Sequence, residues 1–247
     1  MEIFGALLAG SFIGAVLGYV GAGGAMLGVP ILIYIFSYTP HHATTASLAI
    51  VGLAAASGAI VKARNKEILY RDALIIWSIG LITNIGFSSI SDKFSENFIT
   101  TGFALVLFLA GISMLRPPFK DTHTRMPVSI LIFISLLIGT ITGLFGIGGG
   151  FLAIPILVLF FGTPQKVASG TSLVIIALNS ITALFGHYRL WDEVKWSVPA
   201  AMALSAIVIS NLASRKGSRD SSANTKRYFT ALLIAVALFT LGQTWIF

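Results

Sequence analysis

The sequence predicts an all-α integral membrane protein, a polytopic helical bundle of two inverted-topology repeats with about 8–10 helical segments. Three observations lead to this prediction. The 247-residue chain is 56% hydrophobic and 10% charged, with a mean hydropathy of +0.91, whereas a soluble chain carries about 25% charged residues. Charge-free intervals long enough to cross a bilayer recur along the chain, and a glycine-rich pattern occurs once in each half.

The composition also excludes several classes of function. Residues 3–61 contain no Asp, Glu, Lys or Arg, so a water-soluble enzyme is not expected. The net charge of +7 does not indicate nucleic-acid binding, because the basic residues fall in short gaps between apolar runs, as in cytoplasmic loops of membrane proteins. Cys is absent, which excludes disulfides and thiolate ligands. With no paired carboxylates and no nucleophile–base set, we expect no catalytic residues and no metal site.

Six charge-free intervals each suit one membrane crossing of about 20 residues. They are residues 42–61, 73–91, 97–115, 167–188, 196–214 and 228–247. Two further intervals, 3–36 and 127–161, are too long for one crossing, since about 34 helical residues would extend roughly 50 Å. Each contains a glycine cluster, Gly21 to Gly24 or Gly146 to Gly150. Because glycine disfavours helix and adopts positive φ readily, we predict a helix break at each cluster.

The distribution of Lys and Arg predicts the orientation of the chain. The basic gaps at 62–71, 116–125 and 215–227 are placed inside, and the acidic or balanced gaps at 92–96 and 189–195 outside. Each glycine-broken interval must then begin and end on one side, as a helical hairpin or re-entrant pair. Each repeat therefore has one such pair and three crossing helices, and both termini are predicted outside.

An internal repeat appears at an offset of 125 residues. Gly18, Pro30 and Ser47 align with Gly143, Pro155 and Ser172. A polar, proline-containing segment near 116–125 separates residues 1–118 from 119–247, which we interpret as two membrane repeats of one transport domain. Corresponding loops carry opposite charge bias, so the halves are predicted to be inverted. Secondary transporters use this architecture and bind substrate where the interrupted helices meet.

A broken membrane helix exposes backbone N–H groups that bind anions without a charged side chain. No predicted span contains Asp or Glu, so we expect a small anionic substrate. Ser47 and Ser172 are repeat-equivalent, as are Lys62 and His187, which we expect at span ends with their polar groups extended to water. The candidate substrate-binding residues are Gly21, Gly23, Gly24, Ser47, Asn84, Gly146, Gly148, Gly149, Gly150, Thr171, Ser172 and Asn179.

The duplicated glycine clusters, each followed by a proline at Pro30 or Pro155, resemble the TauE/SafE sulfite exporter family, also called the toluene sulfonate uptake permease family. The resemblance spans nearly the whole chain, although Ala25 stands where the second half has Gly150. It implies a multi-pass carrier of the bacterial or archaeal inner membrane, without a bound cofactor, that moves sulfite, sulfonates or related anions.

These inferences favour a secondary transporter of small sulfur-containing anions, such as sulfite, sulfoacetate or taurine-like compounds, working by alternating access around the two breaks. A passive anion channel, a carrier of another small organic anion and a non-transporting membrane scaffold stay open as alternatives. The expected partners are the anion and the lipid bilayer. A coupling ion, either a proton or another ion, and a homodimer stay open as well.

Overall fold

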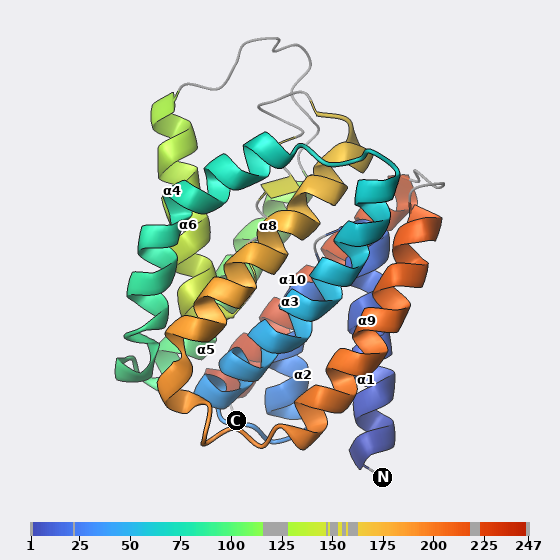
Figure 1. Cartoon of the computed structure of the whole chain (residues 1–247). Coiled ribbons are helices and arrows are strands. Elements are labelled where there is room, and N and C mark those ends of the chain that lie inside the picture. Colours follow the sequence, from blue (N-terminus) through green and yellow to red (C-terminus); the bar gives the residue numbers. More distant parts are fainter. Residues whose placement is uncertain are drawn as a thin grey trace.

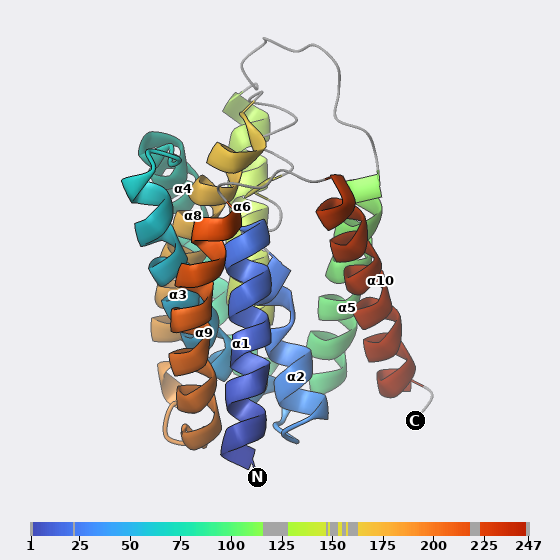
Figure 2. The same cartoon turned by 90° about the vertical axis from the view of Figure 1, so that its right-hand side faces the viewer.

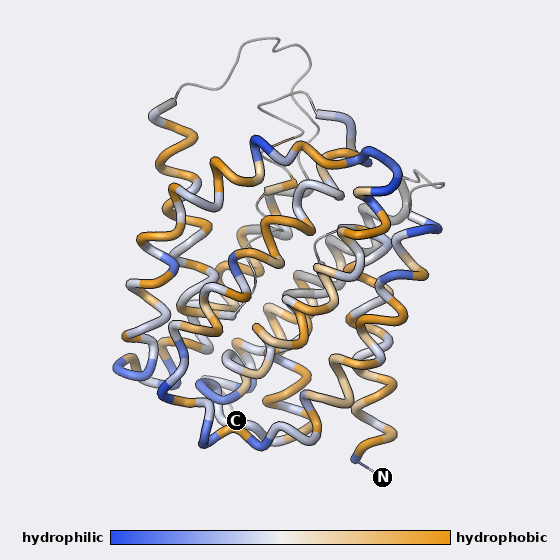
Figure 3. The backbone as a smooth tube through the Cα atoms, viewed as in Figure 1, coloured by the Kyte–Doolittle hydropathy of each residue, from blue (hydrophilic) through white to orange (hydrophobic). Residues whose placement is uncertain are grey.

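A computed structural model describes residues 2–21, 23–115, 128–146, 148, 153–154, 157, 163–217 and 223–245. Over these residues the chain is a helical bundle without strands (Figure 1). Figure 3 shows hydrophobic residues along the helices and hydrophilic residues gathered at the two ends of the bundle. Four of the described helices are long and apolar enough to cross a membrane: Glu2–Val20, Pro40–Arg64, Lys166–Gly186 and Ser197–Gly217. The predicted class, a polytopic helical membrane protein, is confirmed.

The described helices follow the predicted order. The first half contains α1 (Glu2–Val20), η1 (Gly23–Met26), α2 (Gly28–Tyr34), α3 (Pro40–Arg64), α4 (Tyr70–Ser88), η2 (Ser91–Lys93) and α5 (Glu96–Leu115). The second half contains α6 (Val128–Phe145), α8 (Gln165–Gly186), η3 (Tyr188–Leu190), α9 (Ser197–Gly217) and α10 (Ala223–Trp245). α10 begins five residues before the charge-free interval 228–247, because a helix can continue past its apolar segment into water.

The helices end at the predicted glycines. Val20 closes α1 and Gly21 follows with φ +88°, while Phe145 closes α6 and Gly146 follows with φ +67°. These left-handed conformations are costly for a residue with a Cβ. The returning helix α2 has seven residues, about 10 Å of helix, which is too short to span a bilayer. The first glycine-broken interval is therefore one long helix and one short returning helix.

The start of α3 is fixed by local chemistry. Thr39 has extended backbone angles, and its hydroxyl accepts a hydrogen bond from the backbone N–H of His42, as an N-cap does. Pro40 follows at the first helical position, where its missing N–H costs nothing. The chain thus turns sharply from α2 into α3 at one end of the bundle.

Helices of one half pack on helices of the other. α1 lies against α9 and α4 against α6, while α3 also contacts α9 and α8 also contacts α4. In Figures 1 and 2 the first helix of each half runs in opposite directions, with α1 starting at the end marked N and α6 starting at the far end. The start of α1 and the end of α10 lie at the same end of the bundle (Figure 2).

Small residues allow the closest approaches between helices. On α1, Gly10, Gly14 and Gly18 lie against α9, where an added Cβ would meet the backbone of Met202, Ala206 or Ser210. Glycine at every fourth position permits such contact between membrane helices. At the centre α3 crosses α8, and an added Cβ on Gly52 would lie 3.1 Å from Cβ of Ser180. The helices α5 and α10 form a pair at one edge (Figure 2).

Candidate functional site

Ser47 of α3 joins the two glycine-broken segments. Its buried hydroxyl donates a 3.4 Å hydrogen bond to the carbonyl of Gly146, directly after α6. Gly28, the first residue of α2, lies so close that an added Cβ would contact the same hydroxyl. The start of the returning helix in one half and the end of the broken helix in the other thus meet at one serine.

The left-handed glycines that directly follow α1 and α6 occupy equivalent environments in the two halves. Gly21 packs on Ser169 near the start of α8, and Gly146 packs on Thr44 near the start of α3. Thr44 and Ser169 are themselves 125 residues apart. Their side-chain oxygens are buried and have no hydrogen-bond partner among the described residues. Each break is therefore held against an uncommitted hydroxyl of the opposite half.

Gly148 brings the second break to the crossing of α3 and α8. An added Cβ there would lie 2.8 Å from Cγ2 of Ile176 and 3.0 Å from Oγ of Ser180. The Ser180 hydroxyl is buried, and no described residue bonds to it. The backbone at Gly148 can approach Ser180 this closely only because glycine lacks a side chain.

Asn84 of α4 and Asn179 of α8 form a buried pair. Nδ2 of Asn84 donates to the carbonyl of Asn179 at 3.0 Å and to its Oδ1 at 3.1 Å. The second polar atom of each side chain, Oδ1 of Asn84 and Nδ2 of Asn179, has no partner within the described part of the chain. Leaving a buried polar group unbonded costs about 1–3 kcal/mol, so a ligand or water that satisfied these atoms would bind favourably.

We call Thr44, Ser47, Asn84, Asn179 and Ser180 the central polar cluster. Its members come from α3, α4 and α8. Thr44 and Ser47 contact Gly146, Ser180 lies against Gly148, and Asn84 bonds Asn179, the residue before Ser180. None is charged, and hydroxyls and amide N–H groups donate hydrogen bonds without bringing a counter-charge. No group of three or more His, Asp or Glu that could hold a metal ion occurs in the described residues. Nδ2 of Asn179 and the hydroxyls of Thr44 and Ser180 are the donors of this cluster that no described residue uses.

The structure brings together five of the predicted site residues: Gly146, Gly148, Ser47, Asn84 and Asn179. Ser180 was not predicted, and its only sequence signal was a hydroxyl beside Asn179 in a charge-free span. The remaining predicted residues lie away from the cluster or outside the part of the chain that the structure describes. Gly24 packs on the backbone of α1, Gly21 lies against Ser169, Ser172 is buried in α8, Gly23 is in η1, and Gly149 and Gly150 lie outside the described residues.

Thr171 has a structural role in this conformation. Its hydroxyl donates to the carbonyl of Val167 at 2.7 Å and accepts from the backbone N–H of Leu69 at 2.9 Å. Both partners lie where the loop between α3 and α4 meets the start of α8. Its hydroxyl therefore ties that loop to α8.

The expectation that Lys62 and His187 extend to water is wrong. Lys62 is 1% exposed and donates to Glu67 at 2.9 Å, and His187 is 2% exposed within a hydrogen-bond network. Each finds polar partners inside the protein, so neither needs water. His187 directly follows the membrane-spanning α8, and burial lowers its pKa to about 4.

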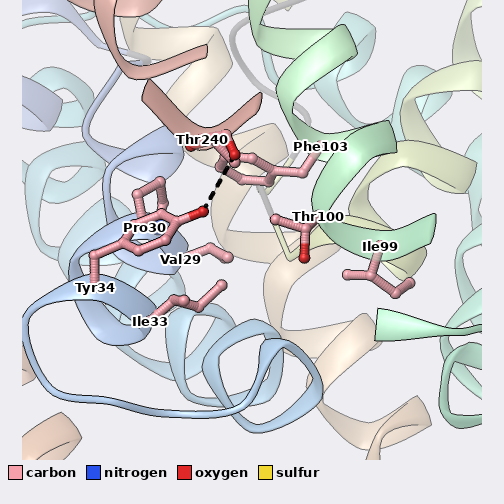
Figure 4. Close-up of a pocket in the computed structure, with 8 residues that line it drawn as sticks. All are labelled: Val29, Pro30, Ile33, Tyr34, Ile99, Thr100, Phe103 and Thr240. Carbon is pink, nitrogen blue, oxygen red and sulfur yellow. Dashed lines mark hydrogen bonds between the residues drawn. The ribbon is translucent and has the colours of Figure 1, made fainter. Parts of the chain in front are cut away.

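A separate pocket between α2, α5 and α10 has an empty volume of about 210 Å³ (Figure 4). Its lining is mostly apolar, and Figure 4 shows the Tyr34 hydroxyl directed at the Thr240 carbonyl, 3.5 Å away. The pocket lacks charged groups and offers few hydrogen-bond donors. It is a poorer place for an anion than the central polar cluster. The lining residues are Val29, Pro30, Ile33, Tyr34, Ile99, Thr100, Phe103 and Thr240.

Comparisons with known proteins agree with this architecture. A family model described as sulfite exporter TauE/SafE matches residues 6–240. A probable membrane transporter protein of Xylella fastidiosa is 29% identical over 96% of this chain and 94% of its own length. The probable membrane transporter protein YunE of Bacillus subtilis is 28% identical over 80% of this chain and 82% of its own length. A probable membrane transporter protein of Methanocaldococcus jannaschii is 34% identical over 44% of this chain and 43% of its own length. No solved structure matches.

Proposed function

This chain belongs to the sulfite exporter TauE/SafE family of membrane transporters, and from that premise we propose that it is a secondary carrier of small sulfur-containing anions. Sulfite and short sulfonates such as sulfoacetate are the proposed substrates. The observation that carries the proposal is the central polar cluster, a buried set of uncharged donors where the two glycine-broken segments meet.

The chemistry of the cluster fits an oxyanion. A sulfonate or sulfite group presents three oxygens, each a hydrogen-bond acceptor. Nδ2 of Asn179 and the hydroxyls of Thr44 and Ser180 are buried donors without a described partner. A hydrogen bond to a charged group contributes about 1.5–3 kcal/mol, so a few such bonds offset much of the loss of hydration. Carboxylates, which would repel the substrate, are absent from the cluster.

The two halves supply the means of alternating access. We propose that they are inverted repeats, because α1 on α9 corresponds to α6 on α4 at the 125-residue offset. In such pairs, rocking of one repeat against the other exposes a fixed site to each side in turn. The contacts of Gly21 with Ser169 and of Gly146 with Thr44 are then the equivalent contacts that change. We place the carrier in a bacterial or archaeal inner membrane with both termini outside.

Counterflow in proteoliposomes tests the proposal. Vesicles loaded with unlabelled sulfite, methanesulfonate or sulfoacetate, at equal pH on both sides, should take up the labelled anion saturably. Asn179→Leu should lose exchange, whereas Ser57→Ala, a hydroxyl that bonds the α9 backbone outside the cluster, should retain it. Absence of saturable exchange for every anion would reject the proposal, and single-channel currents would favour the passive channel instead.

A further inference from the structure

His187 holds together three segments at one end of the bundle. It follows α8 directly and is 2% exposed. Its Nδ1 lies 2.9 Å from Oγ1 of Thr45 on α3, and its Nε2 lies 2.9 Å from the carbonyl of Gly143 on α6 and 3.3 Å from Oγ of Ser91 in η2. The ring therefore bridges both halves one turn before the break at Gly146.

The hydrogens of this network can be assigned. A carbonyl only accepts, so Nε2 carries a hydrogen and donates to Gly143. Thr45 has one hydroxyl hydrogen, and its oxygen also lies 3.0 Å from the carbonyl of His41. In a neutral ring that hydrogen must go to Nδ1, which leaves the contact with His41 unused. The contacts His187–Gly143, His187–Thr45 and Thr45–His41 can all be hydrogen bonds at once only when Nδ1 is also protonated. Nδ1 then donates to Thr45, and the Thr45 hydroxyl donates to the carbonyl of His41.

A small pocket lies on one side of the ring. A pocket with an empty volume of about 160 Å³ at this end is lined by His187 together with Ser91, Asp92 and Arg189. The charged or titratable groups that face the ring are His41 from α3, Asp92 from η2 and Arg189 from η3. The described helix α6 contributes none, since residues 128–145 contain no ionisable side chain. The aspartate favours a protonated ring, and the second histidine and the arginine oppose it.

The network is linked to the central polar cluster. Gly143, whose carbonyl accepts from His187, lies against α4, where an added Cβ would be 2.6 Å from the carbonyl of Asn84. Three residues later Gly146 contacts Thr44 and accepts from Ser47. A change in the charge of the ring therefore acts on the end of α6 that borders the candidate anion site.

We infer that His187 is the binding site of a proton that crosses the membrane together with the anion. This inference rests on the proposed function and names its coupling ion. When this end opens, water enters through the pocket, a proton from water binds Nδ1, and Thr45 turns its hydroxyl to His41. The added positive charge attracts the entering anion. When this end closes and the opposite end opens, burial favours the neutral ring, and Nδ1 returns its proton to water on the side where the anion leaves.

The equivalent position in the first half has a different chemistry. Lys62, 125 residues before His187, donates to Glu67 at 2.9 Å and is nearly unexposed. The ammonium of Lys62 is thus already paired with a carboxylate, whereas no described carboxylate contacts the ring of His187. The difference places the proton site at one end only.

Accumulation driven by a pH gradient tests the inference, with methanesulfonate as the probe because its charge does not change with pH in this range. A carrier that moves one proton with one monovalent anion should accumulate the anion about tenfold per unit of pH difference, whatever its orientation in the vesicle. His187→Gln keeps a donor for Gly143 and an acceptor for Thr45 but cannot take the proton. It should retain exchange at equal pH and show no accumulation. His42→Gln, whose ring pairs with the exposed Glu193, is the matched control and should accumulate normally.

The outcomes separate the two claims. Loss of exchange at equal pH in the wild type would remove the proposed function and this inference with it. Normal exchange without accumulation, or accumulation that survives in His187→Gln, would overturn the inference alone. If His187→Gln does not fold, Thr45→Val replaces it. That variant lacks the oxygen that accepts from a protonated Nδ1, so the pH at half-maximal accumulation should move to lower values, and an unchanged pH profile would overturn the inference.

Discussion

Replacing Gly146 by alanine tests whether the second helix break is a required conformation. Gly146 has φ +67°, and an added Cβ would lie 2.7 Å from the carbonyl oxygen of Thr44 and 2.9 Å from its Cγ2. The nearest atom belongs to the backbone of α3, which is buried at that point, so the neighbour cannot simply rotate away. Alanine therefore introduces both a backbone strain and a steric overlap.

The two costs can be added. A residue with a Cβ in the left-handed region costs roughly 1–2 kcal/mol, and overpacking a well-packed site costs about 1–3 kcal/mol. The free energy of unfolding should fall by about 2–5 kcal/mol. Gly86 is the matched control, because it lies within α4 and an added Cβ there meets nothing within 4 Å. Gly86→Ala should gain up to about 1 kcal/mol from helix propensity.

The assay is unfolding of the purified protein in mild detergent by added denaturant, followed by tryptophan fluorescence, together with counterflow in proteoliposomes. Gly146→Ala should unfold at lower denaturant concentration and exchange anion poorly, since the break must be kept in one geometry for Ser47 to bond it. If Gly146→Ala were as stable as Gly86→Ala and exchanged normally, the left-handed break would not be a requirement of the fold.

Three further predictions follow from buried polar groups. Ser180→Ala should raise the KM for anion exchange about tenfold, the loss of one hydrogen bond to a charged group, with unfolding little changed; an unaltered KM would remove Ser180 from the site. Glu67→Ala should destabilise the protein by about 3 kcal/mol because the ammonium of Lys62 stays buried without its carboxylate, and a Lys62→Met, Glu67→Met double variant should recover most of that loss in the same denaturant titration. The unfolded chain binds a proton at His187 below pH 6.5, and the folded chain binds it only near pH 4. The free energy of unfolding should therefore fall by about 3 kcal/mol as the pH drops from 6.5 to 4. Thermal unfolding at a series of pH values should show this loss in the wild type and not in His187→Gln.

The sequence predicted the helices well because the bilayer leaves few alternatives. A segment with no charge and about 20 apolar residues must be a helix, since its backbone groups find no other partners in lipid. The glycine breaks were also predictable, and α1 and α6 end one residue before Gly21 and Gly146. The length of α2 and the exact ends of helices such as α3, α4, α9 and α10 needed the structure, because polarity marks where the lipid ends and not where a helix ends.

The site was predicted less well, because its residues are chosen by packing between halves. Asn84 and Asn179 were candidates as polar residues in apolar spans, but nothing in the sequence showed that they bond each other. Thr171 was a candidate for the same reason, yet its hydroxyl already bonds Leu69 and Val167. His187 was misjudged because its three partners lie 44, 96 and 142 residues away in the chain.

The packing of α1 against α9 has a consequence for biosynthesis. The glycine face of α1 is complete as soon as residue 20 has been made, but its partner begins at Ser197. At about 5–20 residues per second, the ribosome needs on the order of 10–40 s to supply that partner. During this interval the first helix must be held by the insertion machinery or by lipid, with its small-residue stripe uncovered.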